Sequence, residues 1–213
     1  MTVLPRRLYV HVEEPSMQAV MQVLLPRLIV ADAVPWQIID HGSKHALLND
    51  LPRRLAGYAR RLAREDLRVL VLVDRDDDDC IALKRRLEDM AGKVGLATRS
   101  APDAAGRFCV VNRIVVEELE SWFFGDAPAV CAAYAGVPAS LEARAAFRDP
   151  DAIKGGTWEA LERVLKRAGH YAGTHRLPKI EVARRIAPHL QPDRNRSDSF
   201  RQFRLGLTAL VGA

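Results

Sequence analysis

Carboxylates occur at two places in the sequence where a buried strand is expected to end. Glu13 follows the apolar segment 7–12, and Asp74 and Asp76 follow the near-continuous apolar run 67–73. Ligands of open α/β sheets bind beyond the carboxyl ends of the strands, and carboxylates that converge there repel one another unless a cation lies among them. Hard oxygen ligands favour Mg²⁺ or Mn²⁺. We therefore expect a divalent-cation site here, provided that the two strands are neighbours.

Each acidic group also has an ordinary structural explanation. Asp-x-Asp alone is a weak signal, and Asp77–Asp79 suit the first turn of the next helix, where carboxylates meet unpaired amides. Asp74 and Asp76 would point the same way only while the backbone stays extended. What favours a metal site is the combination of Glu13 after one strand with Asp-x-Asp after a later, buried strand.

The order of the expected elements decides whether these carboxylates can meet. Strands are expected at 7–12, 36–39, 67–73 and 108–115, and helices from Pro15, over 44–65, up to about Met90, from Glu117, and over 157–168, 178–189 and 199–210. This alternation predicts an α/β fold with a mostly parallel sheet flanked by helices, followed by a C-terminal helical region. Pro26 is expected to kink or end the first helix.

Charge is distributed unevenly along the 213 residues, whose formal net charge is +5. Residues 1–150 hold 20 Lys+Arg and 21 Asp+Glu, whereas residues 151–213 hold 12 and 6. We divide the chain accordingly into an α/β core, 1–150, and a basic helical region packed on it, 151–213. A basic region can bind a polyanion, although on charge alone a set of solvated helix faces is the simpler explanation.

Several classes of protein are disfavoured by the sequence. No apolar run reaches the roughly 18–20 residues of a membrane helix, and the N-terminal segment lacks the apolar core and cleavage site of a signal peptide. Cys80, Cys109 and Cys131 form no CxxC pair, which argues against a zinc site or a disulfide framework and fits a reducing cytosol. We expect a cytoplasmic protein without membrane association. Neither GxxxxGK[ST] nor GxGxxG is present.

The order of these motifs resembles the Toprim domain of primases, topoisomerases and small nucleases. A closer resemblance is to an uncharacterised bacterial Toprim-like family, domain of unknown function 4276, and it spans most of the chain. The segments that carry it are Val12-Glu13-Glu14-Pro15-Ser16, Val71-Leu72-Val73-Asp74-Arg75-Asp76, Glu118-Leu119-Glu120-Ser121-Trp122-Phe123, Pro178-Lys179 and Ser197-Asp198-Ser199-Phe200. The chain departs from the family in two ways: Glu14 replaces a turn glycine, and an acidic residue usual near Met17 is absent.

The resemblance implies a Mg²⁺-dependent or Mn²⁺-dependent nuclease that hydrolyses phosphodiester bonds of DNA or RNA, in a prokaryotic antiphage defence or toxin context. Asp74 and Asp76 would hold the cation, and Glu13 would be a further metal ligand or the general acid/base. Glu120 would complete the metal site from the following helix. Lys179 would neutralise a phosphoryl transition state, although a solvated lysine beside a helix start explains it equally well.

Some assignments stay open at this point. Glu117 and Glu118 are alternatives to Glu120 as the additional metal ligand. Phosphate contacts are expected from basic residues of the C-terminal third, with a solvated face as the default alternative. These residues are Lys154, Lys166, Arg167, Arg184, Arg185, Arg194 and Arg196. The competing functions are a non-catalytic Toprim-like partner module of an ATPase, and a binding domain with an acidic loop.

Overall fold

The computed structural model describes residues 4, 6–29 and 34–212. In these residues one all-parallel sheet has the strand order β2-β1-β3-β4. The strands are β1 (Arg6–Val12), β2 (Trp36–Asp40), β3 (Asp66–Asp74) and β4 (Val110–Val115). The predicted parallel α/β sheet is confirmed, and its two central strands are β1 and β3.

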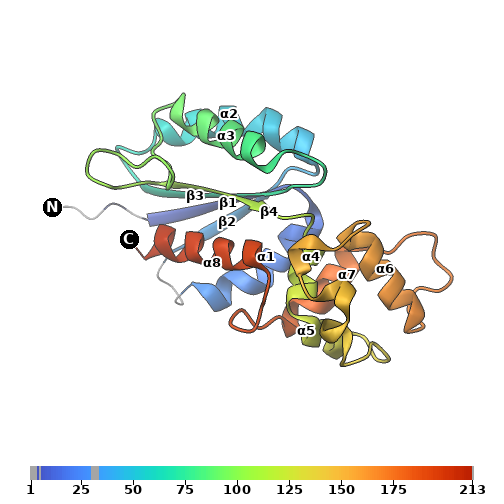
Figure 1. Cartoon of the computed structure of the whole chain (residues 1–213). Coiled ribbons are helices and arrows are strands. Elements are labelled where there is room, and N and C mark those ends of the chain that lie inside the picture. The colour runs from blue at the N-terminus through green and yellow to red at the C-terminus, as the bar shows by residue number, and fades with distance from the viewer. Residues whose placement is uncertain (1–3, 5, 30–33, 213) are drawn as a thin grey trace.

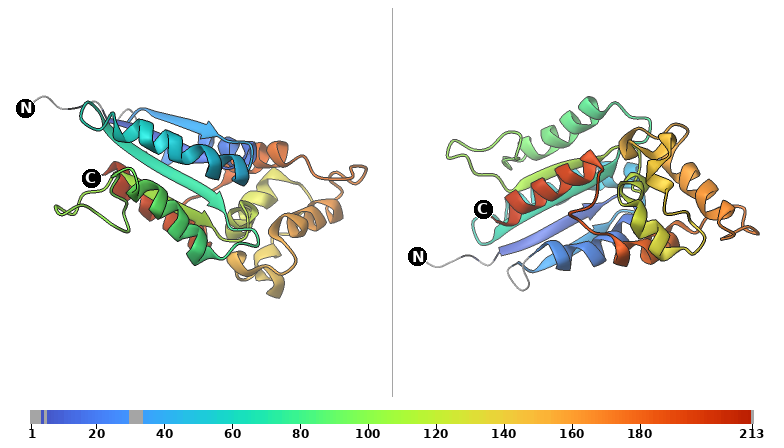
Figure 2. Two further views of the ribbon diagram at one scale, coloured as in Figure 1. Left: turned by 90° about the horizontal axis from the view of Figure 1, so that it is seen from above. Right: turned by 60° about the horizontal axis from the view of Figure 1, so that its bottom comes forward.

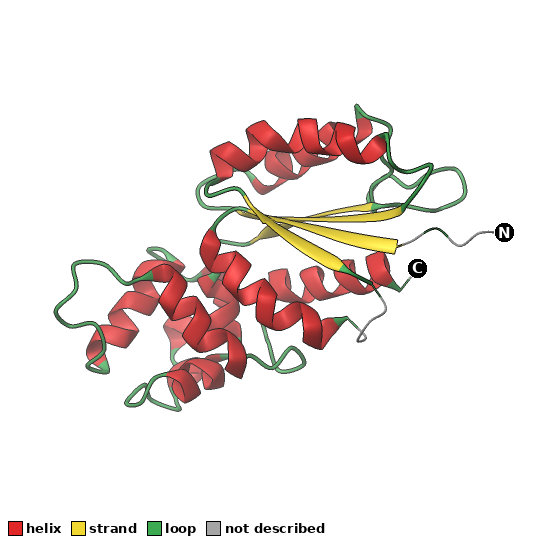
Figure 3. Ribbon diagram, turned by 180° about the vertical axis from the view of Figure 1, so that it is seen from behind, coloured by secondary structure: helices red, strands yellow, loops and turns green. Residues whose placement is uncertain are grey.

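Helices cover both faces of this sheet (Figure 1). On one face lie α2 (Lys44–Ala59) and α3 (Cys80–Gly92), and on the other lie α1 (Pro15–Leu28) and α8 (Asp198–Val211). Figure 3 shows the same three layers from behind, with the strands between two layers of helices. The C-terminal helix α8 contacts β4 and β3, so the end of the chain helps to cover the sheet.

The two-sided cover explains the near-continuous apolar sequence of β3. Leu70 and Leu72 belong to the hydrophobic cluster on the α1 side, whereas Val69, Val71 and Val73 belong to the cluster on the α2 side. Strands that are buried on both faces lack the polar alternation of half-exposed strands. The chain therefore passes directly from this buried apolar strand to the residues that follow β3, which lie at the carboxyl edge of the sheet.

A helical lobe lies beyond the carboxyl ends of the strands (Figure 2). Its helices are α4 (Glu120–Gly125), α5 (Ala127–Ala133), α6 (Thr157–Arg167) and α7 (Lys179–Ile186), and short 3₁₀ turns are η1 (Leu141–Ala143), η2 (Ala145–Phe147), η3 (Pro150–Ala152) and η4 (Ala187–His189). Helix α7 packs against α1 and α5, and α4 packs against α6. The lobe thus faces the edge of the sheet at which ligands of open α/β sheets bind.

Several helices differ from the expected boundaries. The helix expected from Glu117 begins at Glu120, and α3 begins at Cys80 with Asp79 as its N-cap, so Asp77–Asp79 do not lie in its first turn. Helix α2 ends at Ala59 rather than continuing to residue 65, because residues 60–64 form turns whose amides bond back to carbonyls such as that of Tyr58. Helix α1 continues through Pro26 and ends two residues later at Leu28, where the C-cap residue Ile29 is extended. No helix in the described ranges has the length and apolar character that crossing a bilayer requires.

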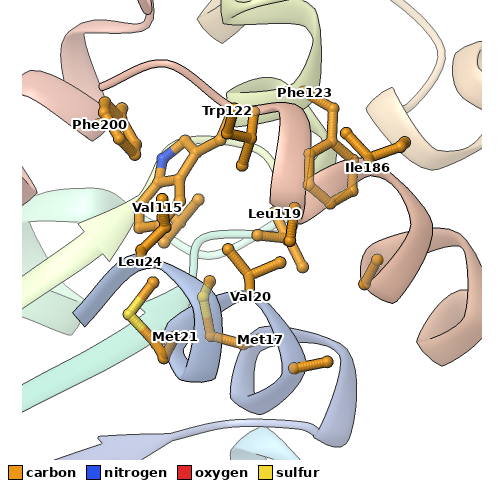
Figure 4. Packing of buried hydrophobic residues seen from close by; sticks show 14 of the residues in the cluster. Met17, Val20, Met21, Leu24, Val115, Leu119, Trp122, Phe123, Ile186 and Phe200 are labelled. Carbon is orange, nitrogen blue, oxygen red and sulfur yellow. The ribbon is translucent and has the colours of Figure 1, made fainter. Parts of the chain in front are cut away.

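An aromatic cluster joins the lobe to the sheet. Trp122 of α4 is fully buried, stacks on Phe203 and meets the edge of Phe200, both from α8. Its indole Nε1 donates to Ser199 Oγ at 2.9 Å. Figure 4 shows Trp122 and Phe200 together, with Met17 and Met21 of α1 in the same cluster. This packing fixes α4, and with it the acidic residues at its start, against both α1 and α8.

Replacing the buried aromatic side chain of α8 tests this packing. We expect Phe203→Ala to lower the free energy of unfolding by about 3–5 kcal/mol, because it removes a ring that is fully buried against Trp122. Leu205→Ala on the same helix, where the side chain is 49% exposed, should stay within about 0.5 kcal/mol of the unchanged protein. Urea unfolding followed by circular dichroism measures both, and equal effects would contradict the packing.

Candidate metal centre

Glu13 and Asp74 meet because β1 and β3 are hydrogen-bonded neighbours. Val12 stands opposite Leu72 in the parallel register, so the residues that follow both strands emerge side by side. The carboxylate Oε2 of Glu13 accepts a hydrogen bond of 3.2 Å from the backbone N–H of Asp74. The condition that the sequence left open, adjacency of the two strands, is therefore met.

Asp74 is a buried carboxyl group with an unsatisfied oxygen. Its exposed fraction is 5%, and Oδ1 has no hydrogen-bond partner within the described structure. Burial raises the pKa of Asp74 well above its usual range, and the nearby charges of Glu13 and Glu120 raise it further. A buried acceptor without a donor is unfavourable, so this oxygen needs either a proton or a cation.

Glu120, in the first turn of α4, is also a buried carboxyl group with an unsatisfied oxygen. It is 1% exposed, and its Oε2 likewise has no hydrogen-bond partner in the part of the chain described. Burial raises the pKa of Glu120 to about 8, although the ammonium group of Lys179 opposes the rise. Burial also raises the pKa of Glu13 to about 7, with Asp76 adding to the rise and Lys44 opposing it. Three neighbouring acids therefore have raised pKa values for the same reason.

Lys179 lies among these acids, although it is distant from them in sequence. From the start of α7, its Nζ is 3.7 Å from Glu14 Oε1 and 3.8 Å from Glu118 Oε1. Burial alone would lower the pKa of Lys179, but the carboxylates of Glu120, Glu14 and Glu118 outweigh burial and raise it. The structure thus brings Lys179 to the candidate site, with its ammonium also 5.1 Å from the ring centroid of Trp158.

Asp76 does not reach the site from an extended strand, as the Asp-x-Asp pattern suggested. Strand β3 ends at Asp74, and Asp76 has φ of 48°, in the left-handed region that few residues other than glycine adopt. Its backbone N–H donates to Glu117 O at 2.9 Å. The expectation that Asp74 and Asp76 point the same way from an extended backbone is therefore wrong. Asp76 still raises the pKa of Glu13, so its carboxylate is part of the acidic group.

Lys44 is a residue of the site that the sequence did not single out. It begins α2, and its Nζ is 2.7 Å from Asp76 Oδ2, 2.9 Å from Asp78 Oδ2 and 3.0 Å from Arg75 O. A signal was present, because a lysine in the first turn of a helix faces the positive end of the helix dipole. Such a lysine needs anionic neighbours, and here the neighbours come from the loop after β3.

The other acidic candidates already have partners. Glu117 has φ of 62° and forms an ion pair with Arg75. Glu118 accepts from Thr157 Oγ1 at 3.1 Å and from Trp158 N at 3.0 Å, and so satisfies the start of α6. Of the three acids considered as the additional ligand, Glu120 has the unpartnered oxygen. Glu14, which replaces the family's glycine, has φ of −138°, which any residue adopts.

The carboxylate oxygens of the site suit a divalent cation, but the side chains are not arranged around a common metal position. Carboxylate oxygens suit Mg²⁺ or Mn²⁺, and two of them, on Asp74 and Glu120, are buried and unpartnered. Within the described ranges, however, no three His, Cys, Asp or Glu side chains are arranged so that they could hold a metal ion. The ammonium groups of Lys44 and Lys179 lie among the carboxylates instead.

The predicted phosphate-binding residues do not share one environment. All of them except Lys166 are exposed. Lys154 precedes α6, Arg167 ends it and Arg184 lies in α7. Lys166 is paired with Glu162 at 2.7 Å. Of the remaining three, Arg185 donates to Ala133 O and covers the ring of Tyr134, Arg194 pairs with Asp126, and Arg196 lies 3.8 Å from Glu142 and donates to Arg148 O.

Fold and site together define an α/β protein with a buried acidic group at the carboxyl edge of a parallel sheet. The family described as "Domain of unknown function (DUF4276)" matches residues 12–208. The chain belongs to this family, as the resemblance of its motifs predicted. A comparison with curated proteins found no match.

The fold also has a distant likeness among solved structures. The C-terminal region of the OLD protein of Xanthomonas campestris pv. campestris, in crystals phased with platinum or with iodine, is 16% identical to this chain. The TM-scores are 0.47 and 0.48, and the alignments cover 97% and 99% of this chain and 94% and 98% of that region.

The raised pKa of Glu120 makes stability depend on pH in a definite direction. Between the ordinary value of 4.5 and about 8, the folded protein holds a proton that the unfolded chain has released, so stability falls as pH rises. Glu120→Gln removes this loss. We expect its stability relative to the unchanged protein to be greater at pH 8 than at pH 5, by about 3 kcal/mol.

Urea unfolding at both pH values in EDTA measures the difference. Glu142→Gln is the matched control, because the Glu142 side chain is 44% exposed and its carboxylate lies 3.8 Å from Arg196. A Glu120→Gln effect that is the same at pH 5 and pH 8 would show that Glu120 ionises as it does in water.

Proposed function

We propose that this protein is a Toprim-type, Mg²⁺-dependent or Mn²⁺-dependent nuclease that hydrolyses phosphodiester bonds of DNA or RNA. The observation that carries the proposal is the pair of buried, unpartnered carboxylate oxygens, Asp74 Oδ1 and Glu120 Oε2, beside Glu13 at the carboxyl edge of the sheet. Structural carboxylates are usually satisfied by donors, whereas carboxylates kept for a cation need not be.

Each residue of the group would have a distinct task. Glu13, Asp74, Asp76 and Glu120 would hold the cation, which when bound polarises a phosphoryl oxygen and lowers the pKa of a bound water. As the alternative to metal ligation, Glu13 would be the general acid/base, because burial raises its pKa to about 7. Lys179 would place positive charge where negative charge grows on the phosphoryl group.

Contacts with the nucleic-acid backbone would come from the exposed basic side chains of the lobe. Lys154, Arg167 and Arg184 are exposed, and such residues supply sequence-independent affinity for phosphates. Lys166 and Arg185 are less suited, because Glu162 and the Ala133 carbonyl already bind them. By family resemblance alone, we extend the proposal to a cytoplasmic role in antiphage defence or as a toxin, with an ATPase as partner.

Metal binding and cleavage test the proposal together. We expect calorimetry to show saturable Mn²⁺ binding that weakens about tenfold or more in Asp74→Asn, because this change removes a negative ligand oxygen. Cleavage of single- and double-stranded DNA and RNA should be lost in the same variant. Asp79→Asn is the control: Asp79 Oδ1 accepts from Ala82 N at 2.7 Å, and asparagine keeps this helix cap.

Two outcomes would contradict the proposal. Equal Mn²⁺ binding by Asp74→Asn, Asp79→Asn and the unchanged protein would mean that Asp74 is not a metal ligand. Specific Mn²⁺ binding without cleavage of any nucleic acid would instead favour the non-catalytic partner module.

The basic side chains are tested by the salt dependence of binding. Arg184→Gln should weaken binding of a labelled oligonucleotide in Ca²⁺ and reduce the slope of log K against log salt by about 1, because one phosphate contact is lost. Arg185→Gln should instead lower the unfolding temperature, since its guanidinium binds Ala133 O and lies 4.5 Å from the ring centroid of Tyr134. An unchanged salt slope in Arg184→Gln would remove this residue from the interface.

A further inference from the structure

Lys44 has an environment that its position in the helix does not explain. It is the first residue of α2, where the helix dipole disfavours a positive charge, and the first turn of α2 contains no acidic residue. Its side chain is nevertheless only 15% exposed. The stabilising partners are therefore elsewhere, in the loop that follows β3.

That loop surrounds the ammonium group with oxygen atoms. Asp76 Oδ2, Asp78 Oδ2 and the carbonyl of Arg75 lie 2.7, 2.9 and 3.0 Å from Lys44 Nζ. Glu13 is close enough for Lys44 to lower its pKa. Carboxylates and a backbone carbonyl around one cation are also the ligand types of a divalent metal ion.

We propose that Lys44 is the internal counter-ion of the acidic site, and that a divalent cation binds by displacing its ammonium group from Asp76. This inference rests on the proposed function, since it assigns a competitor to the proposed metal site. Among the described residues no three acidic, histidine or cysteine side chains are arranged to hold a metal ion, and Asp76 is bound by Lys44 instead. With Asp76 held by Lys44, the carboxylates stay apart.

The displaced side chain has room to move. A hollow of about 440 Å³ adjoins Lys44 between the starts of α2 and α3, and His45, Leu48 and Arg86 also line it. The aliphatic stem of a lysine is compatible with the apolar part of such a wall while its ammonium stays in water. Lys44 can therefore leave Asp76 by rotation of its own side chain, without movement of the sheet.

Calorimetric titration with Mn²⁺ alone tests the competition. Lys44→Met should bind Mn²⁺ roughly tenfold more tightly than the unchanged protein, because the competing charge is gone. Lys44→Arg, which keeps the charge, should not show this gain. Arg53→Met on the same helix, where the side chain is 82% exposed, should leave the affinity unchanged.

The direction of the change in Mn²⁺ affinity distinguishes a Lys44 that competes with the cation from one that only positions Asp76. If Lys44 only positioned Asp76, Lys44→Met would bind Mn²⁺ less tightly or equally, and either result overturns the inference while leaving the metal site standing. Binding that is detectable in Lys44→Met but too weak to measure in the unchanged protein supports it. Absence of binding in every variant, Lys44→Met included, overturns both the inference and the proposed metal site.

Displacement is observed directly by labelling lysines with an N-hydroxysuccinimide ester and measuring each site by mass spectrometry. Saturating Mn²⁺ should increase labelling of Lys44 several-fold in the unchanged protein and leave the exposed Lys93 unchanged. Asp74→Asn should abolish the increase. Labelling of Lys44 that stays constant or falls when Mn²⁺ is bound would overturn the displacement.

Discussion

The burial of carboxylates at one edge of a parallel sheet is the constraint on which the rest of the structure depends. Removing a carboxylate from water costs several kcal/mol unless a proton, an ammonium group or a metal ion compensates it. Asp74 and Glu120 are almost completely buried, and Glu13 accepts a hydrogen bond from the backbone of Asp74. The raised pKa values of all three acids express this cost. The site is therefore built to take up positive charge.

The sheet, the loop after β3 and the helical lobe all contribute charged side chains to the site. The sheet supplies Glu13 and Asp74, the loop after β3 supplies Asp76 with Lys44 opposite it, and the lobe supplies Glu120 and Lys179. The aromatic packing of α4 against α8 holds the lobe in place over the sheet edge. The packing of Trp122 against α8 thus helps to place Glu120, which begins the same helix.

The sequence was sufficient to predict the parallel sheet, because apolar runs that alternate with helices leave few arrangements for such a sheet. It left open whether the strands that precede Glu13 and Asp74 are neighbours, and the pairing of β1 with β3 supplies that answer. The sequence was insufficient for Asp76 and Lys44. The left-handed backbone of Asp76 depends on a hydrogen bond to Glu117, which follows a different strand. The contact of Lys44 likewise joins the start of α2 to the loop after β3, and no local pattern encodes it.

Anomalous X-ray diffraction from crystals grown with Mn²⁺ tests most directly whether the acidic group binds a divalent cation. We predict a manganese peak within about 2.5 Å of carboxylate oxygens of Asp74 and Glu13, with Lys44 Nζ no longer bonded to Asp76. A map without a peak at this edge of the sheet, or with one only at Asp77–Asp79, would contradict the account.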